Sequence, residues 1–105
     1  MKKYEQLMVN EDIEEVYNDL LSCIDHFGST KIGILRSCNA VVYQTHGYTY
    51  LESYGKKVAC IGHDDNICYD FLRMVYGYTA TSAKHISKFC TDYLSYGKRT
   101  YYPVN

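Results

Sequence analysis

The sequence predicts an α+β fold with an N-terminal helix, an antiparallel sheet of three to five short strands, and a C-terminal helix. Two apolar patterns with the helical period lie near the ends of the chain, and short segments rich in β-branched and aromatic residues lie between them. The connections between these segments are short, which favours antiparallel neighbours because a parallel crossover needs a dozen residues or more. We expect both helices to pack on one face of the sheet.

The first helix is expected from about Glu11 to Phe27. Asn10 is a suitable N-cap, acidic residues in the first turn oppose the positive end of the helix dipole, and Gly28 ends the helix. The apolar residues form one wide stripe: Ile13, Val16, Tyr17, Leu20, Leu21, Ile24 and Phe27.

The central part of the chain predicts short strands joined by turns. The connection at residues 62–66 is typical of a hairpin loop, because Gly, Asp and Asn tolerate the positive φ angles of tight turns. The expected strands are Ile32–Leu35, Val41–Tyr43, Tyr48–Leu51, Val58–Ile61 and Ile67–Leu72.

The second helix is expected from Ala80 or Ser82 to Ser95, where apolar residues again follow the helical period. Gly97 follows as a helix terminator. We interpret the tail at residues 98–105 as an edge strand or a loose end.

The length and composition indicate one folded domain, residues 1–105. Apolar residues make up 47% of the chain, and 7 glycines with 1 proline exclude a collagen-like or low-complexity chain. No stretch approaches the length of a membrane-spanning helix, and the first residues lack the apolar run of a signal peptide. We therefore expect a cytoplasmic protein of its host cell, with no membrane partner.

The five cysteines favour buried reduced thiols over a disulfide framework, because their number is odd and none forms a C-x-x-C pair. Cys60, His63 and Cys68 have a spacing that permits zinc ligands, with His85 or Cys90 as a fourth. A structural zinc site more typically has paired ligands on both sides of the metal. We therefore favour a chain without metal or cofactor and keep the zinc site as an alternative.

No catalytic residue is predicted. No thiol lies in a strand-turn-helix context that would expose and activate it, and no third residue is suggested to orient a histidine. The chain has no G-x-S-x-G, no phosphate-binding glycine loop and no H-E-x-x-H. Asp64 and Asp65 fit a turn better than a carboxylate pair, because neighbouring side chains of a strand point to opposite faces. These observations disfavour an enzyme.

Tyrosine is the compositional outlier, with 13 residues. Tyrosine is enriched where proteins meet proteins, because it offers a large contact area with few rotors and a hydroxyl that tolerates water. The alternative, that many of these rings wall the core, stays open. The predicted partner-binding residues are Tyr48, Tyr50, Lys56, Arg73, Tyr76 and Tyr78.

Charge is unevenly distributed along the chain. Residues 1–30 carry two lysines and seven acids, whereas residues 31–105 carry nine bases and five acids. A small nucleic-acid-binding regulator that uses the basic, tyrosine-rich body is therefore the alternative function, since single strands stack on aromatic rings. The basic residues are spread out, which favours two differently charged faces instead.

Two segments carry a resemblance to a known family. Residues 51–59 read L-E-S-Y-G-K-K-V-A, and residues 78–89 read Y-T-A-T-S-A-K-H-I-S-K-F. They are similar to the patterns L-x-S-Y-x-T-x-V-A and Y-S-x-T-T-x-x-H-I-x-x-F of small uncharacterised proteins from phages and mobile elements of Gram-positive bacteria. The chain departs from these patterns at Lys56, which replaces a threonine, and at Thr79 and Ser82, which replace Ser and Thr.

The motif is typical of a strand, a hairpin and a capped helix. We expect a structural contact in which His85 bonds Ser53, Tyr54 or a neighbouring backbone group, while hydroxyl side chains including Thr81 hold the helix start.

The resemblance implies a phage or mobile-element origin, and small proteins of this kind commonly bind and block host machinery. We therefore predict a non-enzymatic protein that inhibits a host protein. An anti-CRISPR or other anti-defence inhibitor, with a CRISPR effector or another defence component as its partner, is the most specific form. A homodimer is an open alternative.

Overall fold

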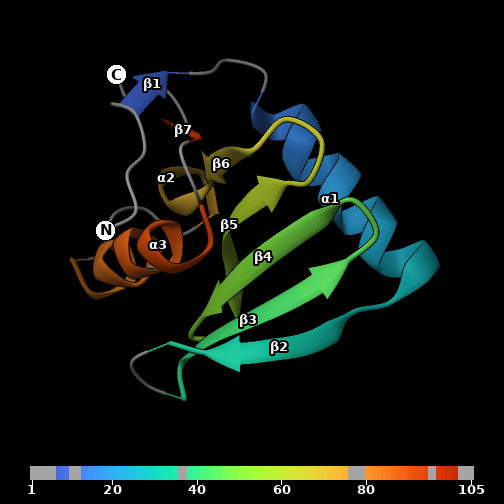
Figure 1. Cartoon of the computed structure of the whole chain (residues 1–105), viewed down its shortest axis with the longest axis horizontal. Coiled ribbons are helices and arrows are strands. Elements are labelled where there is room, and N and C mark those ends of the chain that lie inside the picture. The colour runs from blue at the N-terminus through green and yellow to red at the C-terminus, as the bar shows by residue number, and fades with distance from the viewer. Residues whose placement is uncertain (1–6, 10–12, 36–37, 76–79, 95–96, 102–105) are drawn as a thin grey trace.

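The computed structural model describes residues 7–9, 13–35, 38–75, 80–94 and 97–101. Within these ranges the chain forms an α+β fold of seven strands and three helices (Figure 1). In chain order the elements are β1 (Leu7–Val9), α1 (Ile13–Phe27), β2 (Thr30–Ile34), β3 (Ala40–Thr45), β4 (Tyr48–Ser53), β5 (Lys56–Gly62), β6 (Ile67–Asp70), α2 (Leu72–Val75), α3 (Ala80–Tyr93) and β7 (Lys98–Tyr101).

The predicted N-terminal helix is confirmed as α1, although β1 precedes it. Ile13 and Leu20 are fully buried, as expected for members of its apolar stripe. Gly28 adopts a φ of 73° and donates its backbone N–H to the Ile24 carbonyl at 2.8 Å, which ends the helix. The predicted N-cap Asn10 lies outside the described residues.

The strands form one mixed sheet in the order β1-β7-β6-β5-β4-β3-β2, counted over the described residues. From β2 to β6 each strand pairs antiparallel with its neighbour in the chain, so the predicted strand segments pair as expected. β7 lies between β1 and β6 and pairs parallel with both. The predicted sheet of three to five antiparallel strands is therefore wrong in strand number and in the direction of pairing at one end.

The parallel pairing follows from the segment that joins β6 to β7. This segment contains α2 and α3, which makes it long enough for the crossover that parallel neighbours require. Because β1 and β6 pair with its two edges, β7 is an interior strand, whereas an edge strand or loose end was expected at residues 98–105. The last described element is this strand, so α3 is not the C-terminal element of the described chain.

The two long helices lie on opposite faces of the sheet. Successive side chains of a strand point to opposite faces, and along β4, β5 and β6 they alternate between two core clusters. One cluster contains α3 residues together with Leu51, Ala59 and Cys68. The other contains α1 residues together with Tyr50, Cys60 and Tyr69. The prediction that both helices pack on one face is therefore wrong, and Figure 1 shows α3 to the left of the sheet and α1 to the right.

The hairpins show why these strands turn where they do. Tyr54 and Gly55, between β4 and β5, have φ angles of 51° and 79°, as the two central residues of a type I′ turn require. Between β5 and β6, Asn66 has a φ of 55° and the Asp65 carboxylate accepts the backbone N–H of Ile67 at 3.1 Å. The loop predicted at residues 62–66 is therefore present.

Within the part of the chain that the structure describes, every helix is too short or too polar to cross a bilayer.

Candidate functional site

The four predicted partner-binding residues that the structure describes do not gather into one surface. Tyr48 begins β4, whereas Lys56 begins β5 at the other end of the same hairpin, and Arg73 is exposed on α2. Tyr48 is half-buried, and its hydroxyl donates to a carboxylate oxygen of Asp19 on α1 at 2.5 Å. Two further candidates lie outside the described residues: Tyr76 and Tyr78.

Tyr50 belongs to the core, which corrects its prediction as an exposed contact residue. Its side chain is only 2% exposed because it lies on the sheet face that α1 covers. The ring stacks on Tyr43 with centroids 5.3 Å apart, and the hydroxyl donates to Ser29 Oγ at 2.6 Å. A ring held in this way offers no surface to a partner.

A buried polar cluster joins β4 to α3 at the residues of the family-like motif. Ser53 Oγ lies 2.8 Å from His85 Nδ1 and 2.9 Å from Ser82 Oγ. The Tyr54 ring stacks on the His85 imidazole with centroids 5.9 Å apart. The expected contact of His85 with Ser53 and Tyr54 is therefore formed.

Ser82, from the hydroxyl run that was expected to hold the helix start, is the member of that run that joins this cluster. Thr81 is exposed near the start of α3, whereas Ser82 is fully buried and faces Ser53. The run of hydroxyl residues in the sequence pointed to this helix start, but its periodicity did not say which hydroxyl turns inward. The contact of His85 with Ser53 was therefore expected, whereas the contact of Ser82 with Ser53 was not.

The cluster is suited to structural support. Ser53 is 0% exposed, so its hydroxyl is not available to a substrate. Burial lowers the pKa of His85 below its usual value, which keeps the imidazole neutral. The Ser53 hydroxyl, which contacts both the neutral imidazole and the Ser82 hydroxyl, satisfies buried polar groups and links the helix to the sheet.

A second candidate is a cavity of about 330 Å³ between α1 and the loops of two hairpins, lined by Cys23, His46 and several acids. Burial and the charge of Asp19 raise the pKa of the Cys23 thiol, so it is protonated and a weak nucleophile. The His46 ring stacks on Phe27 with centroids 4.5 Å apart. The cavity is thus a polar, acidic hollow in which the thiol is not activated.

The alternative zinc site at Cys60, His63 and Cys68 is not formed. Cys60 lies in the α1 cluster and Cys68 in the α3 cluster, so their sulfur atoms point to opposite faces of the sheet. His63 is exposed, and its Nε2 lies 2.9 Å from the Thr49 hydroxyl. Among the residues that the structure describes, no three His, Cys, Asp or Glu side chains are placed to hold a metal ion.

The core also contains a buried ion pair. Arg99 of β7 donates from Nη2 to Asp70 Oδ2 at 2.9 Å, and Asp70 Oδ1 accepts the backbone N–H of Leu72 at 3.0 Å. Burial alone would lower the pKa of the Arg99 guanidinium, but the hydrogen bond and charge of Asp70 raise it. The pair holds β7 against β6 at the start of α2.

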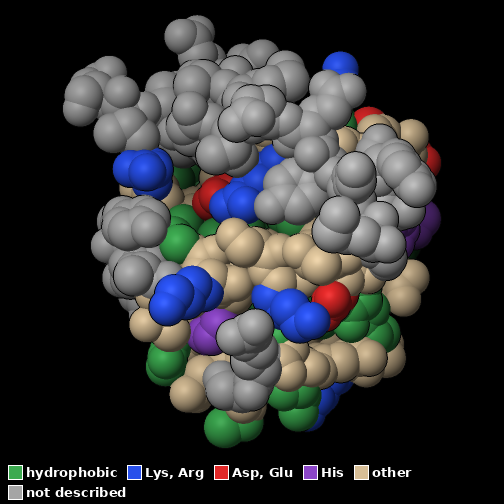
Figure 2. Space-filling view, turned by 60° about the vertical axis from the view of Figure 1, so that its left-hand side comes forward, with side chains coloured by type: hydrophobic (Ala, Val, Ile, Leu, Met, Phe, Trp, Pro, Cys, Tyr) green, Lys and Arg blue, Asp and Glu red, His purple; other side chains and the backbone are tan. Residues whose placement is uncertain are grey.

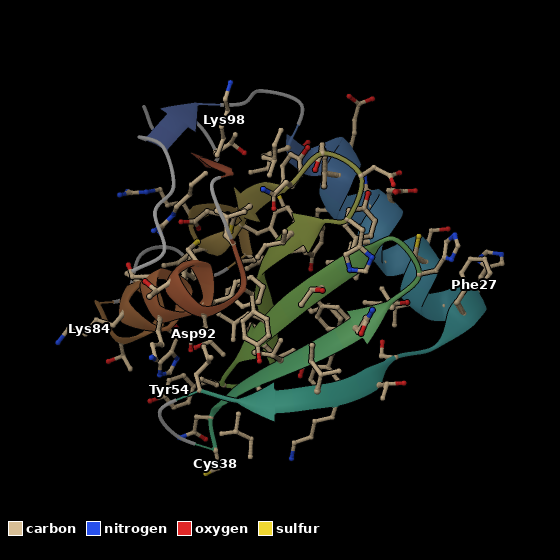
Figure 3. All side chains as sticks on the ribbon, in the orientation of Figure 1. Phe27, Cys38, Tyr54, Lys84, Asp92 and Lys98 are labelled. Atoms are coloured by element: carbon tan, nitrogen blue, oxygen red, sulfur yellow. The ribbon has the colours of Figure 1, made fainter. Side chains whose placement is uncertain are left out.

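Three of the exposed apolar side chains lie at the end of α1 and on β2. Among the described residues five large apolar side chains are exposed, and three of them, Phe27, Ile32 and Ile34, fall within residues 27–34. Their exposed fractions are 64%, 42% and 49%. Figure 3 shows Phe27 projecting away from the body of the molecule where α1 leads into β2. β2 is also the last strand on its side of the sheet.

The exposed charges occupy different parts of the molecule. Figure 2 shows lysine and arginine side chains spread over the side that carries α3. The exposed acids of α1 and the β5–β6 loop are Glu14, Glu15, Asp19, Asp25, Asp64 and Asp65. The exposed bases come from five elements: Lys31, Lys56, Arg73, Lys84 and Lys98. The described bases therefore form no concentrated stripe.

Comparison with protein-family models, with curated proteins and with solved structures finds no match for this chain. The resemblance to the phage family stays a prediction that rests on two segments. Of these, residues 51–59 form most of the β4–β5 hairpin, and residues 80–89 of the second segment lie in α3.

Proposed function

We propose that this chain is a non-enzymatic binding protein that docks onto another protein through β2. The observation that carries the proposal is the coincidence of a sheet edge that is free among the described strands with the exposed side chains of Ile32 and Ile34 on that edge. Large apolar side chains that stay exposed together mark surfaces that bind other proteins.

The backbone of β2 supports binding by addition of a strand. Among the described strands β2 pairs only with β3, so its other side presents unpaired N–H and C=O groups. An extended segment of a partner would complete these hydrogen bonds and extend the sheet. The hydrogen bonds supply affinity that depends little on the partner's sequence, and the flanking side chains supply selectivity.

The side chains beside β2 favour an apolar partner. Ile34 pairs with Val41 of β3, and paired residues of neighbouring strands point to the same face of the sheet. Val41 is half-buried, so the two side chains together offer an apolar contact next to the free edge. Burial of such surface contributes about 25 cal/mol for each Å² removed from water.

Two features of β2 restrict its partners. Lys31 is exposed on the strand, and the register with β3 shifts between Lys31 and Gly33. A lysine and a bulge on an edge strand both oppose indiscriminate pairing with other chains. A matching partner therefore carries an acidic residue opposite Lys31 and a strand that follows the bulge.

In its most specific form, the proposal makes this chain a phage or mobile-element protein that inhibits a host protein by stoichiometric contact, as an anti-CRISPR or other anti-defence inhibitor. This form rests on the resemblance of residues 51–59 and 78–89 to the phage family. The test is expression of the chain in a host with active CRISPR interference, scored by the efficiency of plating of a targeted phage. Plating at the level of an empty vector would contradict the anti-CRISPR form.

The docking surface is tested with two matched substitutions. Ile34→Lys places a charge on the β2 edge, whereas Leu21→Lys places the same charge on an exposed apolar position of α1. Each purified variant is used to capture proteins from host lysate, and the captured protein is then titrated by calorimetry. We expect Ile34→Lys to weaken binding at least tenfold and Leu21→Lys to bind as the wild type does.

Each of the other outcomes identifies which part of the docking proposal is wrong. Equal binding by both variants would remove β2 from the interface. Failure of the wild-type chain to retain any protein would contradict protein binding itself. If sedimentation shows a wild-type dimer that Ile34→Lys dissociates, the strand added to β2 comes from a second copy of the chain.

A nucleic-acid-binding regulator is the second candidate, and one observation favours it. The Tyr54 ring is 50% exposed. The exposed Lys56 lies two residues after Tyr54 in the chain, and the exposed Lys84 directly precedes His85, whose ring stacks on Tyr54. Figure 3 shows Tyr54 and Lys84 on the side of α3. An exposed ring with nearby bases suits stacking of a single strand. Retardation of oligo(dT) that weakens with salt and is lost in Tyr54→Ala would support this candidate, and no retardation would exclude it.

A further inference from the structure

We propose that Cys68 and Cys90 form an oxidisable pair, which a hydroperoxide converts into a disulfide that links β6 to α3. The two sulfur atoms lie 3.3 Å apart, and the Cys90 thiol donates a hydrogen bond to Cys68 Sγ. Both side chains are fully buried in the same core cluster. The proposed modification site is independent of the surface on β2.

The geometry leaves little movement between the thiol pair and a disulfide. A disulfide bond is about 2.05 Å long, so the sulfur atoms need to approach by roughly 1.3 Å, which small side-chain rotations can supply. The two residues come from elements that already pack together, β6 and α3. No change of fold is therefore needed to form the bond.

The position of the other thiols makes this pairing selective. The Cys60 side chain points to the opposite face of the sheet, so the sheet lies between it and Cys90. Cys23 is half-buried on α1, and Cys38 is exposed in the turn before β3. Among the described cysteines, Cys68 and Cys90 are therefore the pair whose sulfur atoms lie in direct contact.

The surroundings favour reaction at Cys90. When Cys90 is ionised, its sulfur accepts a hydrogen bond from the Cys68 thiol, which lowers the pKa of Cys90 against the effect of burial, and the positive charge of Arg99 adds to the lowering. The same hydrogen bond, together with burial, raises the pKa of Cys68. We therefore propose Cys90 as the attacking thiolate and Cys68 as the thiol that resolves the intermediate.

The reaction balances with hydrogen peroxide as the oxidant. The Cys90 thiolate attacks one peroxide oxygen, the O–O bond breaks, and hydroxide leaves, which gives a sulfenic acid on Cys90. Cys68 then attacks the Cys90 sulfur, the S–O bond breaks, and the Cys68 proton leaves with the hydroxyl group as water. Two thiols lose two electrons and peroxide becomes two waters. Because both sulfurs are buried, peroxide has to reach them through the core or during a local opening of α3.

The experiment treats the full-length, dithiothreitol-reduced protein with hydrogen peroxide, blocks the remaining thiols with N-ethylmaleimide in denaturant, and maps tryptic peptides by mass spectrometry. We expect two fewer blocked thiols and a cross-link between peptides 58–73 and 89–98. Fragmentation of peptide 58–73 assigns the linked sulfur to Cys68 and not to Cys60, which lies in the same peptide. The thermal midpoint is expected to rise on oxidation and to return with dithiothreitol, because the disulfide constrains the unfolded chain.

Two variants keep the test decisive. Cys38→Ser removes an exposed thiol and is expected to give the same cross-link and the same rise as the wild type. Cys90→Ser is expected to show neither, and Cys68→Ser replaces it as the test if the Cys90 variant fails to fold. A cross-link between other cysteines, or a sulfinic acid on Cys90 with Cys68 still free, would overturn the proposal.

Discussion

Replacing Arg99 by methionine is expected to lower the free energy of unfolding by about 3–5 kcal/mol, because it leaves the Asp70 carboxylate buried without its counter-charge. The two side chains are 10% and 12% exposed, so water can do little to replace the lost partner. Methionine keeps much of the aliphatic volume of arginine, which limits the contribution of a cavity.

The sheet register explains why this pair is so well buried. Arg99 of β7 lies opposite Cys68 of β6, and Asp70 follows Cys68 by two residues on the same strand. Residues two apart on a strand share a face, and paired residues of neighbouring strands do so as well. Both charged side chains therefore point to the face that α3 covers.

A double-mutant cycle separates the ion pair from the packing around it. Asp70→Asn keeps an oxygen that can accept the Leu72 N–H, and it removes the carboxylate charge. The double variant Asp70→Asn, Arg99→Met leaves no unpaired charge, so we expect it to be more stable than Arg99→Met alone.

The measurement is urea unfolding followed by circular dichroism. With a slope of about 2 kcal/mol per M, the predicted loss lowers the midpoint of Arg99→Met by about 2 M. A loss below about 1 kcal/mol, or single-variant losses that simply add in the double variant, would refute the assignment of a coupled buried pair.

Three further predictions concern the core, the close approach at Gly97 and the polar cluster. Leu20→Ala is expected to cost about 2–5 kcal/mol of stability, because this side chain is fully buried. Leu21→Ala, at the neighbouring position with 37% exposure, is the matched control and is expected to cost less than about 1 kcal/mol in the same urea assay. Gly97→Ala is expected to lower the thermal midpoint, since its Cβ would overlap the Asn66 carbonyl oxygen, and an unchanged midpoint would contradict that close approach. The pKa of His85 is lowered in the folded state, so the unfolded chain takes up this proton first as pH falls below 6.5. Wild-type stability is therefore expected to fall between pH 7 and pH 5 more steeply than that of His85→Gln, and parallel curves would show that His85 does not titrate differently on folding.

Some contacts of the candidate sites could be predicted from the sequence, and others depend on the tertiary structure. The contact between His85 and Ser53 was predicted from the two motif segments, although β5, β6 and α2 lie between these residues in the chain. Tyr50 was placed wrongly because alternation assigns a side chain to a face without saying whether that face is covered. The pair Cys68 and Cys90 carried no local signal, since it depends on where α3 lies.

Local sequence determined the elements themselves. The apolar period of residues 13–27 specifies a helix, and the β-branched segments with glycine, asparagine and aspartate turns specify the strands from β2 to β6. These features follow from hydrogen bonding and side-chain spacing over a few residues, so neighbouring residues suffice to define them.

The arrangement of the helices and the last strand was decided by contacts between distant parts of the chain. β5 is apolar on both faces, so its pattern requires cover on each side but does not assign α1 to one face and α3 to the other. The charged composition of the β7 segment is typical of an edge strand. In the structure β7 is an interior strand, because Asp70, far away in the sequence, pairs with Arg99 inside the core. Because burial and charge pairing act through space, only the folded chain determines which residues meet.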